Sequence, residues 1–183
     1  MRPIHDVHPA AVTSALALAL AIQAIPAGAA DMEAHLRYGQ DGGKYDGAGV
    51  GLRLGPVWSK DLLGWRTTLH PEFELTHFRY TGSAGGPSSM NQAGAIGMFR
   101  FDRGSGNVRP YGEIGLGANL FSRDRLGEKD FSTSFQFSEH LGLGLEFGGG
   151  WFAGWRYSHY SNADIKKPNN GIDLQQILIG VHF

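Results

Sequence analysis

The chain has 183 residues, which is enough for one domain, and it carries 16 Lys and Arg against 17 Asp and Glu. The formal net charge of -1 gives little support to nucleic-acid binding, because a polyanionic backbone attracts an excess of positive charge. The absence of cysteine excludes a disulfide framework, a thiolate nucleophile and a Cys-ligated metal site. Chemistry therefore has to come from oxygen and nitrogen groups. The 28 glycines and 11% aromatic residues suit closely approaching strands better than a helical bundle.

Residues 1–30 have the order of a secretory signal peptide. An alanine- and leucine-rich run extends over Ala10–Ile25, and the small residues Ala27–Ala29 follow it. The run is shorter than the ~20 apolar residues that a membrane-spanning helix requires, and Pro26 ends it. We therefore expect cleavage near Ala29 or Ala30, secretion of the product, and a single mature domain at residues 31–183.

In the mature chain, side-chain polarity alternates with a period of two. From Phe131 to Phe147 the odd positions are mostly aromatic or aliphatic, whereas the even positions are polar or glycine. This alternation is typical of a β-strand with two different faces. The segment is far longer than the ~5–6 residues usual in soluble sheets, and it exceeds the ~9–11 residues that cross a bilayer at a tilt.

The same period recurs along the chain and predicts an all-β fold. We expect eight strands, at Glu33–Gln40, Gly47–Leu54, Trp65–Phe78, Asn91–Phe101, Arg109–Phe121, Phe131–Phe147, Trp151–Tyr160 and Leu174–Phe183. Short connections at 101–107 and 148–150 alternate with longer polar ones at 81–90 and 122–130, as on the two rims of an outer-membrane barrel. The pattern predicts an eight-stranded antiparallel transmembrane β-barrel with both termini on the periplasmic side.

Two features favour the outer membrane of a Gram-negative cell. The last strand closes on Phe183, and a terminal aromatic residue resembles the C-terminal pattern of bacterial outer-membrane proteins. Charged residues on polar strand faces could pair across a polar lumen, and they are Arg66, Glu72, Glu74, Arg100, Glu113 and Glu146. A soluble lipocalin-like barrel would show the same period with its apolar face inside, and it predicts extraction without detergent.

A histidine, a serine and a carboxylate come together where the last two strands meet. His159 and Ser161 are two residues apart, so their side chains leave the same face of an extended strand, where imidazole can take the hydroxyl proton. Both continue the outward stripe of Trp155, and Asp173 shares parity with Ile177 on the neighbouring strand. All three side chains are therefore expected on the lipid-facing surface.

The strand directions predict the depth of this group in the membrane. With both termini periplasmic, strand seven ends and strand eight begins at the outer leaflet, where lipopolysaccharide resides. We expect Ser161 to attack a lipid ester after His159 removes its proton, forming an acyl-enzyme that water hydrolyses. Asp173 would orient the imidazole, and Asn162 would stabilise the oxyanion through its amide or its backbone N–H.

The same segment resembles the C-terminal signature of the PagL-type lipid A 3-O-deacylases. The matching residues are His159–Ala163, Ile165, Pro168-Asn169 and Gly171–Asp173. The resemblance implies a serine esterase that removes the ester-linked 3-hydroxyacyl chain at position 3 of lipid A, with the four roles given above. The family commonly has glutamate as the third member, so Asp173 is one methylene shorter, and Asp164 is the alternative orienting acid.

Other side chains have simpler expected roles. We expect no cofactor and no metal, because the histidines lack metal-ligand spacing and no nucleotide-binding glycine fingerprint is present. The aromatic residues expected in an interfacial belt are Trp151, Trp155, Tyr157 and Tyr160. The basic loop residues that could meet lipid A phosphates are Arg123, Arg125, Lys129, Lys166 and Lys167.

Rival functions stay open at this point. A non-catalytic structural or adhesive barrel predicts unchanged lipid A in cells. An outer-membrane phospholipase would also use serine and histidine, but it would cleave glycerophospholipids. Lipid-facing aromatic patches further permit a homodimer.

Overall fold

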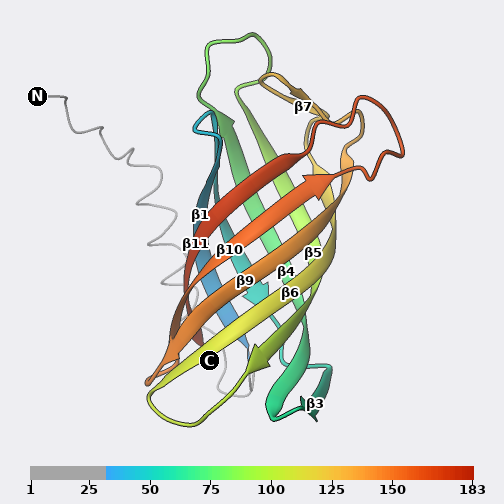
Figure 1. Cartoon of the computed structure of the whole chain (residues 1–183). Coiled ribbons are helices and arrows are strands. Elements are labelled where there is room, and N and C mark those ends of the chain that lie inside the picture. The colour runs from blue at the N-terminus through green and yellow to red at the C-terminus, as the bar shows by residue number, and fades with distance from the viewer. Residues whose placement is uncertain (1–31) are drawn as a thin grey trace, which may run out of the picture. The chain divides into compact units, whose positions relative to one another are not determined.

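The computed structural model describes residues 32–183, and the predicted signal peptide lies outside this range. All regular elements of this range are strands (Figure 1). No helix within it is long and apolar enough to cross a membrane. The strands are β1 (Glu33–Asp41), β2 (Tyr45–Arg53), β3 (Trp58–Leu62), β4 (Trp65–Tyr80), β5 (Ser89–Asp102), β6 (Val108–Phe121), β7 (Arg125–Leu126), β8 (Lys129–Asp130), β9 (Phe135–Phe147), β10 (Trp151–Ser161) and β11 (Ile172–His182).

Eight long strands close into a barrel, which confirms the predicted fold class. Each pairs antiparallel with its neighbours in the order β1, β2, β4, β5, β6, β9, β10 and β11, and β11 returns to pair with β1. Closure pairs the backbone groups of every barrel strand, which a lipid environment requires. Figure 1 shows the strands tilted around the barrel, with β3 and the C-terminus at one end and β7 at the other.

The two faces of the barrel wall differ sharply in polarity. Outward positions carry exposed apolar side chains such as Leu116, Leu143 and Ile177, which are 71%, 60% and 64% exposed. A band of this kind in water would be an aggregation hazard, whereas in a bilayer it is the lipid-facing surface. The apolar face is therefore outside, as a membrane barrel requires, and the lipocalin-like alternative is wrong.

The lumen holds a buried network of ion pairs. Arg53 contacts Glu33 at 3.0 Å, Glu72 at 2.7 Å and Glu113 at 2.6 Å, and all four side chains are buried. Arg156 joins the same two carboxylates of Glu72 and Glu113 from the opposite wall. Since a buried charge without a partner is costly, this network ties several strands into one arrangement.

All but one of the predicted lumen charges are buried and paired with a charge of opposite sign. Arg100 pairs with Glu113 at 3.0 Å and with Glu146 at 2.6 Å, and Glu74 pairs with Arg37. Arg66 is instead exposed at the rim, because it is the second residue of β4 and lies beyond the last β2 pairing.

An apolar cluster fills the outer end of the lumen. Its members are Tyr45, Phe78, Tyr80, Met90, Phe121, Leu126, Phe131, Tyr160, Ile172 and Leu174. Tyr160 was expected in the interfacial belt, and this expectation is wrong: its even parity on β10 turns the ring inward, where it is fully buried. The cluster gives the two strand ends that carry the predicted site a rigid base.

Two local features depart from the predicted strands. The predicted strand from Phe131 begins only at Phe135, because Ser132 has a φ of 58° and turns the chain. Phe131 therefore packs edge-to-face on Phe121 inside the barrel instead of facing lipid. The predicted set also lacks β3, which continues along β4 after the irregular segment 54–57 and forms a projecting hairpin with it.

Candidate active site

The candidate site lies where β10 ends and β11 begins, at the end of the barrel opposite the C-terminus (Figure 1). His159 on β10 pairs directly with Asp173 on β11. The adjacent residues Tyr160, Ile172 and Leu174 point inward and are almost fully buried in the apolar cluster. Because successive side chains on a strand alternate, this anchoring turns His159 and Asp173 outward.

His159 and Asp173 form a hydrogen-bonded pair on the outer wall. The distance from His159 Nδ1 to Asp173 Oδ1 is 2.7 Å, and the two side chains are 32% and 46% exposed. An ionised carboxylate can only accept hydrogen bonds, so the shared proton belongs to Nδ1. His159 Nε2 then keeps a free lone pair, which is the form of imidazole that a general base requires.

Ser161 lies on the same face as His159 but is not hydrogen-bonded to it within the described residues. Its Oγ instead accepts a long hydrogen bond from the backbone N–H of Ala163, at 3.5 Å. Catalytic contacts between a hydroxyl and its base are often long without substrate and tighten when it binds. The structure thus brings base and acid together and leaves the hydroxyl on the same side, next to them.

Contacts among three distant segments hold this arrangement. Gly171 lies against the His159 ring, and a Cβ at this position would be 2.7 Å from His159 Cε1. Lys129 Nζ donates to Gly171 O at 2.5 Å and pairs with Asp41 Oδ2 at 3.1 Å. The same Asp41 oxygen accepts the backbone N–H of Asp173 at 3.2 Å. Lys129 and Asp41 were not singled out as positioning groups from the sequence, since the link needs three distant segments.

Asn162 holds the turn that follows Ser161. Its side chain is buried, and Nδ2 donates to Phe131 O and Lys166 O at 2.8 Å each. Its backbone N–H donates to Asn169 Oδ1 at 3.0 Å. All three N–H bonds of Asn162 therefore have partners in the loops.

Asp164, the alternative orienting acid, has its partners within its own loop. It pairs with Lys167 at 3.6 Å and its side chain is 65% exposed. Two of the other basic loop residues are also paired, Lys129 with Asp41 and Arg125 with Asp130. Of these carboxylates, only that of Asp173 accepts the hydrogen bond of His159 Nδ1.

A second histidine–serine group lies in the lumen. His140 Nδ1 is 2.8 Å from Ser158 Oγ, and its Nε2 is 2.9 Å from Ser138 Oγ. All three residues are buried among the lumen charges. Both imidazole nitrogens are occupied and no lipid could reach the hydroxyls, so this group satisfies buried polar atoms and is not a catalytic site.

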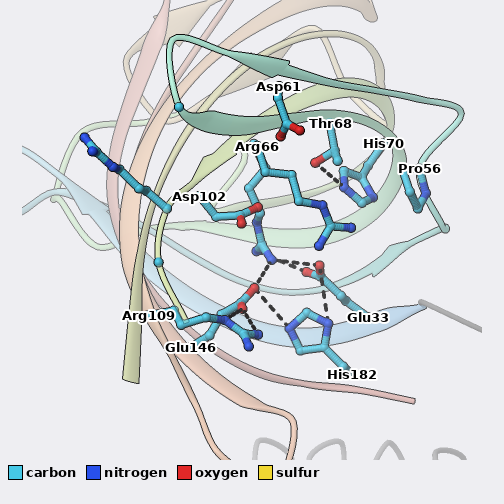
Figure 2. A pocket seen from close by; sticks show the side chains of 14 residues that line it. Glu33, Pro56, Asp61, Arg66, Thr68, His70, Asp102, Arg109, Glu146 and His182 are labelled. Carbon is cyan, nitrogen blue, oxygen red and sulfur yellow. Dashed lines mark hydrogen bonds and ion pairs between the residues drawn. The ribbon is translucent and has the colours of Figure 1, made fainter. Parts of the chain in front are cut away.

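A polar pocket of about 400 Å³ lies at the end of the barrel that carries the C-terminus (Figure 2). Several of its charged side chains are paired with one another: Glu146 contacts Arg109 at 2.6 Å, and Glu33 contacts His182 at 3.6 Å. His70 in this pocket bonds to Thr68 Oγ1 and to a backbone carbonyl. The pocket is thus at the far end of the strands from His159 and contributes nothing to the candidate site.

Comparisons with known proteins match this chain to one family. A family model described as Lipid A 3-O-deacylase (PagL) matches residues 46–182, a range that includes the whole candidate site. The lipid A deacylase PagL of Bordetella bronchiseptica is 38% identical over 150 residues, covering 81% of this chain and 82% of that protein. The lipid A deacylase PagL of Pseudomonas aeruginosa is 31% identical over 128 residues, covering 69% and 74%.

The fold also has a counterpart among solved structures. The crystal structure of the outer membrane enzyme PagL superposes on this chain with a TM-score of 0.73 at 24% sequence identity. The superposition covers 81% of this chain and 98% of that one. This likeness supports the barrel architecture.

Proposed function

The chain belongs to the lipid A 3-O-deacylase (PagL) family, and we propose that it hydrolyses the ester-linked 3-hydroxyacyl chain of lipid A with Ser161, His159 and Asp173 as its catalytic triad. The observation that carries the proposal is the 2.7 Å hydrogen bond from His159 to Asp173 on the outer wall of the barrel. A histidine–carboxylate pair has no structural use on a lipid-facing surface, where burying charge is costly. Ser161, two residues along the same face, is the hydroxyl that this base can activate.

The reaction proceeds in two stages. His159 Nε2 removes the proton of Ser161 Oγ, which attacks the ester carbonyl carbon and forms a tetrahedral intermediate. When the tetrahedral intermediate collapses, the 3-oxygen of lipid A leaves and takes the proton from the His159 imidazolium. The acyl chain stays bonded to Ser161 as an acyl-serine. Water, deprotonated by His159, then attacks the acyl-serine and releases the fatty acid. Asp173 keeps the proton on Nδ1 and stabilises the imidazolium in both stages.

Asn162 was expected to donate directly to the oxyanion, but its backbone and side-chain N–H groups are bonded to loop oxygens, so we propose that it acts through the turn that it holds. Its side-chain donors are committed to loop carbonyls, and the next backbone N–H, that of Ala163, already points at Ser161 Oγ. An ester oxygen on the carbon attacked by Ser161 would lie within reach of this N–H. The expected contribution of one such donor is about 3–4 kcal/mol of transition-state stabilisation.

The position of the site matches a lipid substrate. The outward apolar side chains of β9, such as Leu141 and Leu143, lead along the wall toward the site and can contact acyl chains. The opposite end carries the termini, so the site lies in the outer leaflet, where lipid A is.

A second copy of the barrel could pair through lipid-facing aromatic side chains, and chemical crosslinking in intact membranes tests this homodimer.

Mass spectrometry of lipid A tests the proposed function in Gram-negative cells whose lipid A carries the 3-O ester. We expect cells that express the wild type to lose the mass of one 3-hydroxyacyl chain, and cells that express Ser161→Ala to keep it. Ser158→Ala is the matched control, because it removes a serine hydroxyl that bonds a different histidine, His140. All three proteins are first verified as folded in the outer membrane.

Other outcomes of this experiment lead to the rival functions. Unchanged lipid A with folded wild-type protein would refute the deacylase and favour a non-catalytic barrel. Loss of acyl chains from glycerophospholipids, with lipid A intact, would favour a phospholipase.

A further inference from the structure

Tyr157 contacts the acid of the proposed triad. It lies on β10, two residues before His159, and its side chain leaves the same outward face. Its hydroxyl donates a hydrogen bond to Asp173 Oδ1, the same oxygen that accepts the proton of His159 Nδ1. The contact is diagonal across the two strands, since Tyr157 pairs with Gln175 and His159 with Asp173.

An interfacial tyrosine does not require this contact. A belt tyrosine places its hydroxyl among water and lipid headgroups, as its amphipathic ring favours. Tyr38, on the outward face of β1, is such a residue: it is 47% exposed, and its hydroxyl accepts a bond from the nearby Gln40 amide. The Tyr157 hydroxyl instead bonds to a carboxylate that the proposed reaction uses.

The carboxylate benefits from a second donor. Aspartate has a freely rotating carboxyl group on a short stem, and Asp173 is 46% exposed. A hydrogen bond from a hydroxyl to an ionised carboxylate is charge-assisted and therefore strong and directional. The Tyr157 hydroxyl and His159 Nδ1 both donate to Asp173 Oδ1, and together they restrict rotation of the carboxyl group.

We propose that Tyr157 is a positioning residue, which holds the Asp173 carboxylate in the orientation that keeps His159 ready as a base. The inference rests on the proposed function, because it assigns a role to Tyr157 only through the triad. It follows that loss of the hydroxyl slows the chemical steps and leaves lipid binding unchanged.

Steady-state deacylation of lipid A by the purified mature chain in detergent micelles tests this role. We expect Tyr157→Phe to lower kcat about tenfold or more, the effect of one hydrogen bond to a charged group, with KM unchanged. Phenylalanine keeps the ring and its packing, so the barrel stays folded. Tyr38→Phe is the matched control and is expected to keep the wild-type kcat.

A double-mutant cycle separates positioning from contact with the substrate. The background is Asp173→Ala, measured in single-turnover reactions over hours, since triads without one member keep residual catalysis. We expect Tyr157→Phe to change this residual rate by less than about twofold, because the group it positions is gone. The inference would be overturned if Tyr157→Phe kept the wild-type kcat, or if it changed KM alone. It would also be overturned if the substitution lowered the rate by the same factor in both backgrounds.

Ser161→Ala distinguishes failure of the role of Tyr157 from failure of the proposed function. If Ser161→Ala is inactive while Tyr157→Phe is fully active, the role of Tyr157 is wrong and the proposed function stands. If Ser161→Ala keeps the wild-type rate, the triad itself is refuted.

Discussion

The position of the His159 ring depends on the missing side chain of Gly171. An added Cβ would lie 2.7 Å from His159 Cε1 and 3.1 Å from Tyr160 O. Carbon atoms in ordinary contact are about 3.5–4.0 Å apart, so Gly171→Ala displaces the imidazole by roughly 1 Å. A misplacement of this size costs about 10²-fold in rate, and we expect kcat to fall by about this factor. The φ of Gly171 lies outside the left-handed region, so backbone strain adds nothing.

The assay is the release of 3-hydroxy fatty acid from lipid A by folded, purified protein. Gly112→Ala is the matched control: it lies on an outward strand face, and the nearest atom to its Cβ would be Gly142 O at 3.9 Å. We expect this variant to keep the wild-type kcat. If Gly171→Ala is folded and fully active, the ring is not the base or is not held where the structure places it.

Three further substitutions test other parts of the account. Glu72→Gln leaves the buried guanidinium groups of Arg53 and Arg156 without their shared carboxylate charge. We expect it to lower the free energy of unfolding by about 3–5 kcal/mol, measured by urea titration in detergent. An unchanged unfolding midpoint would contradict this expectation. Leu141→Arg places a charge on the lipid face near the middle of β9 and should cost about 2–4 kcal/mol, whereas Ile165→Arg in an exposed outer loop should cost nothing measurable. Lys129→Met removes the ammonium that donates to Gly171 O, and we expect an approximately tenfold lower kcat in the deacylation assay, so a wild-type rate would show that this contact does not position the site.

The alternation of polarity in the sequence predicted the strands and their two faces. Because a strand side chain has only two directions, parity placed Leu143 and Glu72 on opposite faces. Strand length and the terminal Phe183 favoured the membrane barrel, with Leu143 outside and Glu72 inside, and the structure agrees at both positions. Parity also predicted that His159 and Asp173 would share the outward face. Their direct pairing follows from the register of the last two strands, which the loop between them sets.

The remaining details depend on contacts between distant segments. The inward turn of Phe131 comes from a positive φ at Ser132, a conformation that a serine in the sequence does not predict. The side chain of Asn162 bonds to carbonyl groups in two loops, so its direction could not be read from its place beside Ser161. The hydrogen bond from the Tyr157 hydroxyl to Asp173 forms only when β10 and β11 are paired, so the sequence alone did not predict it.

The nucleophile is the central claim, and covalent labelling tests it most directly. An alkyl fluorophosphonate reacts with a serine whose hydroxyl is activated by a histidine base, releases fluoride and stays bonded to Oγ. We expect peptide mass spectrometry of the treated, folded protein to place one adduct on Ser161, together with loss of lipid A deacylation. An adduct on another serine, or full deacylase activity in protein labelled at Ser161, would contradict the account.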